Sequence, residues 1–111
     1  MEEIDLTTMK DYMKSYFLIK KIYDIHFELL NNDDNPINYK LITVNFNILN
    51  RIRDINFSFV SNVGILDQIK EYKKVGNLLN LQVFLDPNLK EDKIIFHTEQ
   101  RDQEYELLVQ I

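Results

Sequence analysis

The chain of 111 residues contains no cysteine, no tryptophan and no alanine, and only two glycines and two prolines. The absence of cysteine excludes disulfide bonds, zinc-thiolate sites and thiol nucleophiles. Gly64 and Gly76 are too few for a glycine-rich phosphate-binding loop. The sequence also lacks an N-terminal basic and apolar signal segment and any apolar run of about 18 residues. We therefore expect a cytoplasmic protein that makes no contact with a membrane.

Basic residues are outnumbered in both halves of the chain, with seven against nine acidic residues in 1–60 and six against nine in 61–111. The net charge is −5, whereas proteins that bind nucleic acids typically carry an excess of basic residues. An acidic surface favours a protein partner with a basic patch. The abundant residues, which include 14 Ile and 12 Asn, are encoded by AT-rich codons. From this we infer an AT-rich source genome, which gives no information on the function of the protein.

The length fits one compact domain over residues 1–111. In the first half, Leu6, Met9, Met13 and Phe17 repeat at helical spacing, which predicts a helix over 6–20. From residue 23 to 29 the pattern alternates, as in a half-buried strand. The stretch 31–36 (NNDDNP) is the strongest turn signal. Alternation over 39–50 and again over 55–59 predicts two further strands, which are joined by a tight link at 51–54.

In the second half, apolar spacing after Gly64 predicts a helix over 64–75, with Gly76 as the glycine that ends it. A strand over 79–85 closes at the turn Asp86–Asn88, and residues 93–98 and 104–111 predict a final hairpin.

These elements predict an α+β fold in the order α-β-β-β-α-β-β-β, with a mostly antiparallel sheet and two helices packed on its apolar face. The two halves share the order of elements but no residue-level identity. The residues that we expect to be buried are Phe27, Val44, Phe46, Phe57, Leu81 and Val83.

Candidate chemistry is sparse. His26 and His97 are the only histidines, at outward positions of predicted strands, and two imidazoles without cysteines are too few for a closed metal site. The acidic clusters lie in predicted loops or on an outward face, where contact with water keeps the pKa values of carboxylates in their usual range, unsuited to acid–base catalysis. The serines lack the sequence context of a nucleophile. We therefore expect no catalytic residues, no metal and no cofactor.

The acidic C-terminal third and a few apolar residues on the polar face predict a partner-binding surface. Tyr39 and Leu108 break strict alternation by placing apolar groups on the otherwise polar face. Such groups among acidic side chains are typical of a protein interface or a homodimer. The predicted partner-binding residues are Asp102, Glu104, Glu106, Glu91, Asp92, Tyr39 and Leu108.

The favoured hypothesis is a small acidic non-enzymatic protein that binds and inhibits another protein, encoded by a phage or mobile element as an anti-defence inhibitor. An immunity or antitoxin protein would neutralise a toxin by the same electrostatics. A phage tail or structural subunit would instead assemble with itself, through contacts rich in Tyr and Leu. An enzyme of unknown type is the alternative from another class, and it would need a deep pocket with perturbed titratable groups.

Overall fold

The computed structural model describes residues 2–53, 57–60 and 66–111. In this part of the chain two helices pack with one seven-stranded sheet, which confirms the α+β class. The elements are β1 (Glu2–Asp5), α1 (Asp11–Leu30), β2 (Leu41–Val44), α2 (Phe46–Ile52), β3 (Phe57–Phe59), the short 3-10 helix η1 (Leu66–Gln68), β4 (Lys73–Leu78), β5 (Leu81–Leu85), β6 (Lys93–His97) and β7 (Glu104–Gln110). Their order differs from the two-part repeat that alternation predicted.

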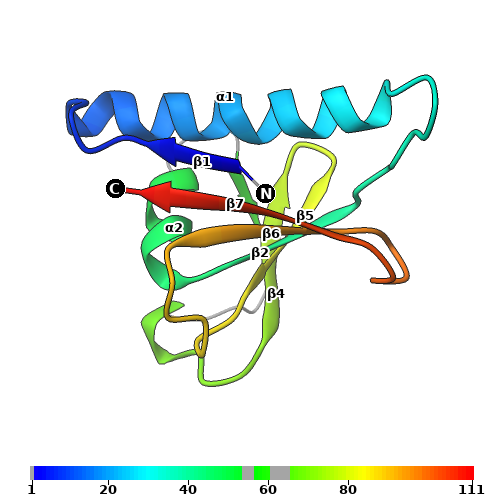
Figure 1. Cartoon of the computed structure of the whole chain (residues 1–111). Coiled ribbons are helices and arrows are strands. Elements are labelled where there is room, and N and C mark those ends of the chain that lie inside the picture. Colours follow the sequence, from blue (N-terminus) through cyan, green and yellow to red (C-terminus); the bar gives the residue numbers. More distant parts are fainter. Residues whose placement is uncertain (1, 54–56, 61–65) are drawn as a thin grey trace.

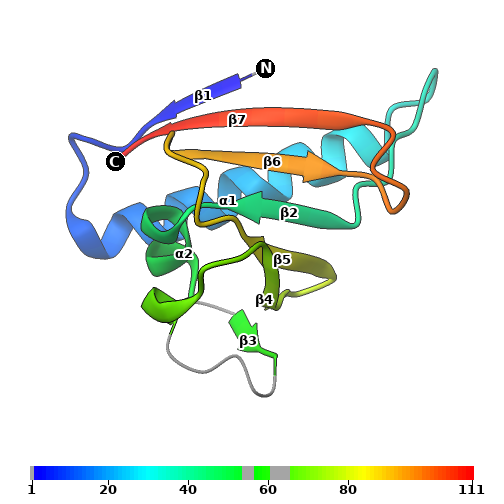
Figure 2. The ribbon, with the colours of Figure 1, turned by 90° about the horizontal axis from the view of Figure 1, so that it is seen from below.

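The sheet has the strand order β1-β7-β6-β2-β5-β4-β3. The pairs β1–β7 and β2–β5 are parallel, whereas the other neighbouring strands are antiparallel. The sheet is therefore mixed, where the sequence analysis expected a mostly antiparallel one. Figure 1 shows α1 running along one face of this sheet, and Figure 2 shows β1, β7, β6 and β2 side by side in front of α1.

The two faces of the sheet differ in character. Tyr105, Phe96 and Ile42 are direct neighbours in the strand register and point toward α1, on the side that we call the inner face. Residues next to these in the sequence, such as Glu106, Ile95 and Thr43, point to the opposite side, which we call the outer face. The inner face and the helices bury one apolar core, which includes Leu18, Ile22, Ile42, Ile48, Val83, Phe96 and Leu107.

Helix α1 continues to Leu30, so the strand expected over 23–29 is wrong. Ile25 and Leu29 fit both an alternating pattern and a helical one that extends Leu18 and Ile22. The helical register buries Leu18, Ile22 and Ile25 against the core. Phe27 then falls on the solvent side and is 48% exposed, so its expected burial is also wrong.

The strand expected over 39–50 is a strand only as far as Val44. The Asn45 side chain accepts a hydrogen bond from the Ile48 backbone N–H at 2.9 Å, and this cap begins helix α2. Ile48, Leu49 and Ile52 are buried at helical spacing. Phe46 is only partly buried against the core, whereas Val44, Leu81 and Val83 are fully buried as expected.

The helix expected over 64–75 is wrong within the described residues, because only Leu66–Gln68 is helical and β4 begins at Lys73. Residues 64 and 65 lie outside the described part. Gly76 ends no helix but lies inside β4, paired with Phe59 of β3. A Cβ at Gly76 would sit 2.4 Å from the Phe57 ring and from the Ser58 carbonyl oxygen. The close approach of β3 therefore requires glycine there.

Several local predictions are confirmed. In the 31–36 turn, the Asn32 side chain accepts hydrogen bonds from the backbone of Asp34 and Asn35. The Asp86 carboxylate accepts one from the Asn88 N–H at 2.9 Å. The C-terminal hairpin forms between β6 and β7. The strand expected over 55–59 is present as Phe57–Phe59, and residues 55 and 56 lie outside the described part. Phe57 is partly buried against the core.

Candidate functional site

Acidic side chains gather on the outer face at the β1–β7 edge of the sheet. Glu104 and Glu106 alternate with core residues along β7, and Leu108 follows them on the same side. Strand β1 adds Glu3, which is the direct register partner of Leu108. We call Glu3, Glu104, Glu106 and Leu108 the acidic face. Sequence reasoning missed Glu3, because the four-residue strand β1 gives no clear alternating signal by itself.

Neighbouring side chains hold two of these carboxylates in place. Lys93 on β6 lies 3.2 Å from Glu106 Oε1. The side-chain amide of Gln110 donates a hydrogen bond to Glu3. Glu104 is 56% exposed, and Ile95, the register partner of Glu106, adds a half-buried apolar group beside it. The acidic face thus combines the exposed carboxylates of Glu3 and Glu104 with the partly buried, Lys93-paired carboxylate of Glu106, next to the apolar side chains of Leu108 and Ile95.

Glu2 has a different role from its neighbour Glu3. It points to the inner side, where its carboxylate lies 2.6 Å from Lys21 Nζ of α1 and accepts a hydrogen bond from the Tyr105 hydroxyl at 2.8 Å. The hydrogen bond from Lys21 is the main cause that lowers the pKa of Glu2. Burial, with help from Glu2, raises the pKa of Tyr105 to about 12. These contacts fasten β1 to α1 and β7.

The remaining predicted partner-binding residues are dispersed. Asp102 lies in the β6–β7 connection, where its carboxylate accepts a hydrogen bond from the Thr98 hydroxyl. Glu91 and Asp92 lie before β6, at the end of that strand opposite to Asp102. Tyr39 is only 2% exposed, and its ring packs 5.9 Å from the ring of Phe96. Tyr39 therefore belongs to the core, and its expected place on the polar face is wrong.

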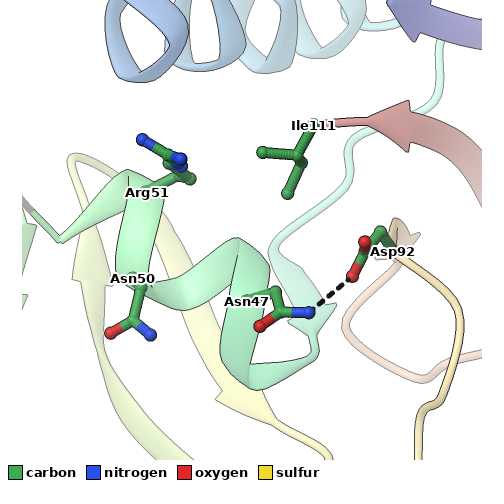
Figure 3. A pocket seen from close by; sticks show the side chains of 5 residues that line it. All are labelled: Asn47, Asn50, Arg51, Asp92 and Ile111. Carbon is green, nitrogen blue, oxygen red and sulfur yellow. Dashed lines mark hydrogen bonds between the residues drawn. The ribbon is translucent and has the colours of Figure 1, made fainter. Parts of the chain in front are cut away.

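Asp92 fastens the β5–β6 connection to α2. Asn45 Nδ2 donates to Asp92 Oδ1 at 2.7 Å and to the Glu91 carbonyl oxygen at 3.0 Å. Asn47 Nδ2 also donates to Asp92 Oδ1, at 3.3 Å (Figure 3). Asn47 and Asp92 line a polar hollow of about 320 Å³ together with Asn50, Arg51 and Ile111. These hydrogen bonds give Asp92 a structural role at the α2 N-terminus.

A buried polar chain crosses the outer face beside the acidic face. His97 Nε2 lies 2.9 Å from Thr43 Oγ1, which in turn lies 3.1 Å from the Tyr72 hydroxyl. On its other side, His97 Nδ1 lies 3.5 Å from Glu104 Oε1, too far for a hydrogen bond, so this buried nitrogen has no hydrogen-bond partner among the described residues. His97 thus lies at an outward position of β6, as expected, but it is only 6% exposed and is therefore buried. Burial lowers the pKa of His97, and the negative charge of Glu104 opposes that shift.

The order carboxylate, imidazole, hydroxyl is that of a nucleophile activated by a base. However, Thr43 is only 3% exposed, beneath an aromatic cover. The Tyr72 ring stacks on Phe84 with centroids 5.1 Å apart, and the Arg101 guanidinium lies 4.9 Å from the Tyr72 centroid. Because Thr43 is almost completely buried, this arrangement favours a structural network over a catalytic one.

His26 is also buried, on α1, at 2% exposure, so its expected position on an outward strand face is wrong. Burial and the nearby Lys40 lower its pKa. Among residues 2–53, 57–60 and 66–111, no three His, Asp or Glu side chains are placed to hold a metal ion. Within the same residues, no helix is long and apolar enough to cross a membrane.

Searches against models of known protein families, curated proteins and solved structures each gave no match to this chain.

Proposed function

We propose that this protein acts by binding another protein that carries a basic surface, with the acidic face as the docking site, and that the bound protein is thereby inhibited. The observation that carries the proposal is the convergence of Glu3, Glu104 and Glu106 beside Leu108, from strands at opposite ends of the chain. Carboxylates around an apolar centre resemble the polar rim and apolar core of protein interfaces.

The charges on this face have a defined energetic role. Solvated carboxylates raise the association rate with a basic partner and are screened by salt. Leu108 and Ile95 are half-buried, so a partner can cover the part of each side chain that is still exposed. The apolar contacts would hold the complex, because buried central anchors supply most of the binding energy.

The proposal is tested with two charge-reversal variants of equal net charge. The first replaces Glu3, Glu104 and Glu106 by Lys. The matched control replaces Glu28, Asp33 and Glu71 by Lys, three exposed acids outside the acidic face. The parent chain is immobilised to capture its partner from a lysate of source cells, and association rates are then measured with the purified partner.

We expect the parent and the control to bind a basic protein, and the acidic-face variant to associate at least severalfold more slowly at low salt. Salt should slow the parent strongly and the acidic-face variant weakly. If the acidic-face variant bound as fast as the parent at low salt, the docking site would lie elsewhere.

A further inference from the structure

Helix α1 presents four aromatic side chains along one flank, which we call the aromatic stripe: Tyr12, Tyr16, Tyr23 and Phe27. At about 100° per residue, they fall within an arc of about 60° around the helix axis. Tyr12, Tyr16 and Phe27 are 74%, 58% and 48% exposed. Tyr23 is half-buried, with its ring 6.3 Å from that of Phe27. None of the four belongs to the acidic face, so the stripe is a separate surface.

The spacing of the stripe is symmetric about the middle of the helix. Tyr12 and Phe27 lie equally far from the midpoint between residues 19 and 20, and so do Tyr16 and Tyr23. A second α1 helix that ran antiparallel across a two-fold axis at this midpoint would place Tyr12 against the copy's Phe27. It would also place Tyr16 against the copy's Tyr23. A stripe of this kind is complementary to itself, as a two-fold interface requires.

The charge near the proposed two-fold axis and the exposed aromatic area are both compatible with a second copy of this chain as the partner. Lys20 and Asp24 border the middle of the stripe and form an ion pair at 2.9 Å, so the region near the two-fold axis has no net charge. The exposed fractions of the three outer rings leave roughly 350–400 Å² of aromatic surface per protomer. A stable interface needs about 800 Å² per partner, so the stripe supplies about half of it. This predicts a dimer that dissociates on dilution.

We propose that two copies of this chain associate through the aromatic stripe, in an antiparallel pairing of their α1 helices. Aromatic pairs across the axis supply the attraction. The net charge of −5 on each copy opposes it. Added salt screens that repulsion and strengthens the dimer, whereas it weakens docking at the acidic face. The two proposals therefore predict opposite responses to salt and can fail independently.

Sedimentation velocity of the full chain tests the association. We expect the weight-average mass to rise from monomer toward dimer between about 5 and about 500 µM, because the stripe supplies only about half the area of a stable interface. Tyr16→Glu should weaken the dimer at least about tenfold, because it places a charge in the centre of the apolar contact. Leu79→Asn is the control, since Leu79 is 61% exposed on a different surface and should leave the dimer unchanged.

Cross-linking tests the antiparallel arrangement, because the chain has no cysteine of its own. Lys20→Cys lies beside the proposed two-fold axis and should form a disulfide-linked dimer on mild oxidation. Lys10→Cys, just before α1, would lie about 28 Å from its copy and should stay reduced. A monomer at all concentrations, or a dimer unaffected by Tyr16→Glu, would overturn the proposal. Equal cross-linking at both positions would overturn the antiparallel pairing.

Discussion

Thr43 and His97 lie 54 residues apart in the sequence, yet the Thr43 hydroxyl and His97 Nε2 are 2.9 Å apart on the outer face of the sheet. Each residue is less than a tenth exposed. A polar pair buried this deeply costs free energy unless its members bond to each other. The contact explains why polar side chains can occupy the central strand β2 and its neighbour β6.

Removal of the two partners of Thr43 should affect stability unequally. His97→Ala leaves the Thr43 hydroxyl without its closest partner and creates a cavity, so we expect a loss of about 2–4 kcal/mol in the free energy of unfolding. Tyr72→Phe removes only the hydroxyl and keeps the ring stacked on Phe84, so we expect a loss of about 0.5–1.5 kcal/mol. Urea titration measures both. A loss below about 0.5 kcal/mol for both variants would mean that the polar chain does not stabilise the fold.

Stability should fall in mild acid through the two buried histidines. Burial lowers the pKa of His26 and of His97 in the folded chain below the ordinary imidazole value of about 6.5. The unfolded chain therefore binds more protons as pH falls below about 6.5, and protonation favours unfolding. The charges that face these rings are Lys40 for His26, and Glu104 and Arg101 for His97. We expect the free energy of unfolding to be constant between pH 7 and 8 and to decrease from pH 6.5 to 5.

The double variant His26→Gln and His97→Gln provides the control for this pH dependence. Its free energy of unfolding, measured by urea titration at each pH, should change less between pH 6.5 and 5 than that of the parent. A parent slope that persisted in the double variant would assign the acid sensitivity to other groups.

Two phenylalanines near the core should differ in their contribution to stability. Phe96 has no exposed surface and packs against Tyr39 and Tyr105, so Phe96→Ala should cost about 3–5 kcal/mol. The sequence alone predicts the same loss for Phe46→Ala. Phe46 is only partly buried beside α2, so we expect about half that loss. Denaturant titration of the two variants compares them directly, and a larger loss for Phe46→Ala would contradict the packing described.

Short-range patterns in the sequence predict the elements whose partners are close in the chain. The C-terminal hairpin, the 31–36 turn and the Asp86–Asn88 turn depend on residues a few positions apart, and each is confirmed. Elements with distant partners are not predicted in this way. Strand β1 exists because Glu2–Asp5 pairs with residues 107–110, and no local alternation over four residues can reveal that.

The two helical segments that the sequence pattern predicts as strands, at 23–29 and 46–50, are misassigned for related physical reasons. Ile25 and Leu29 satisfy the helical and the alternating period at once, and only burial beside Leu18 and Ile22 decides between them. Similarly, the cap that Asn45 forms with Ile48 ends a strand pattern that the apolar residues would otherwise continue. The same limits apply to the acidic face, of which Glu104 and Glu106 were predicted and Glu3 was not.

Gly76 offers the sharpest test of how the sheet ends at β3. A Cβ at this position would lie 2.4 Å from the Phe57 ring and from the Ser58 carbonyl oxygen, both in β3. Gly76→Ala therefore forces β3 away from β4, and we expect a loss of about 1–3 kcal/mol in the free energy of unfolding. Amide hydrogen exchange should show reduced protection in β3 and β4, while β6 and β7 keep theirs.

A second substitution separates the two contacts at Gly76. Phe57→Leu in the Gly76→Ala background removes the ring but keeps the Ser58 carbonyl, so it should recover only part of the lost stability. Phe57→Leu alone serves as the reference for the cost of the smaller side chain. Full recovery would show that the ring alone requires glycine. A Gly76→Ala variant as stable as the parent would mean that β3 does not pack this closely on β4.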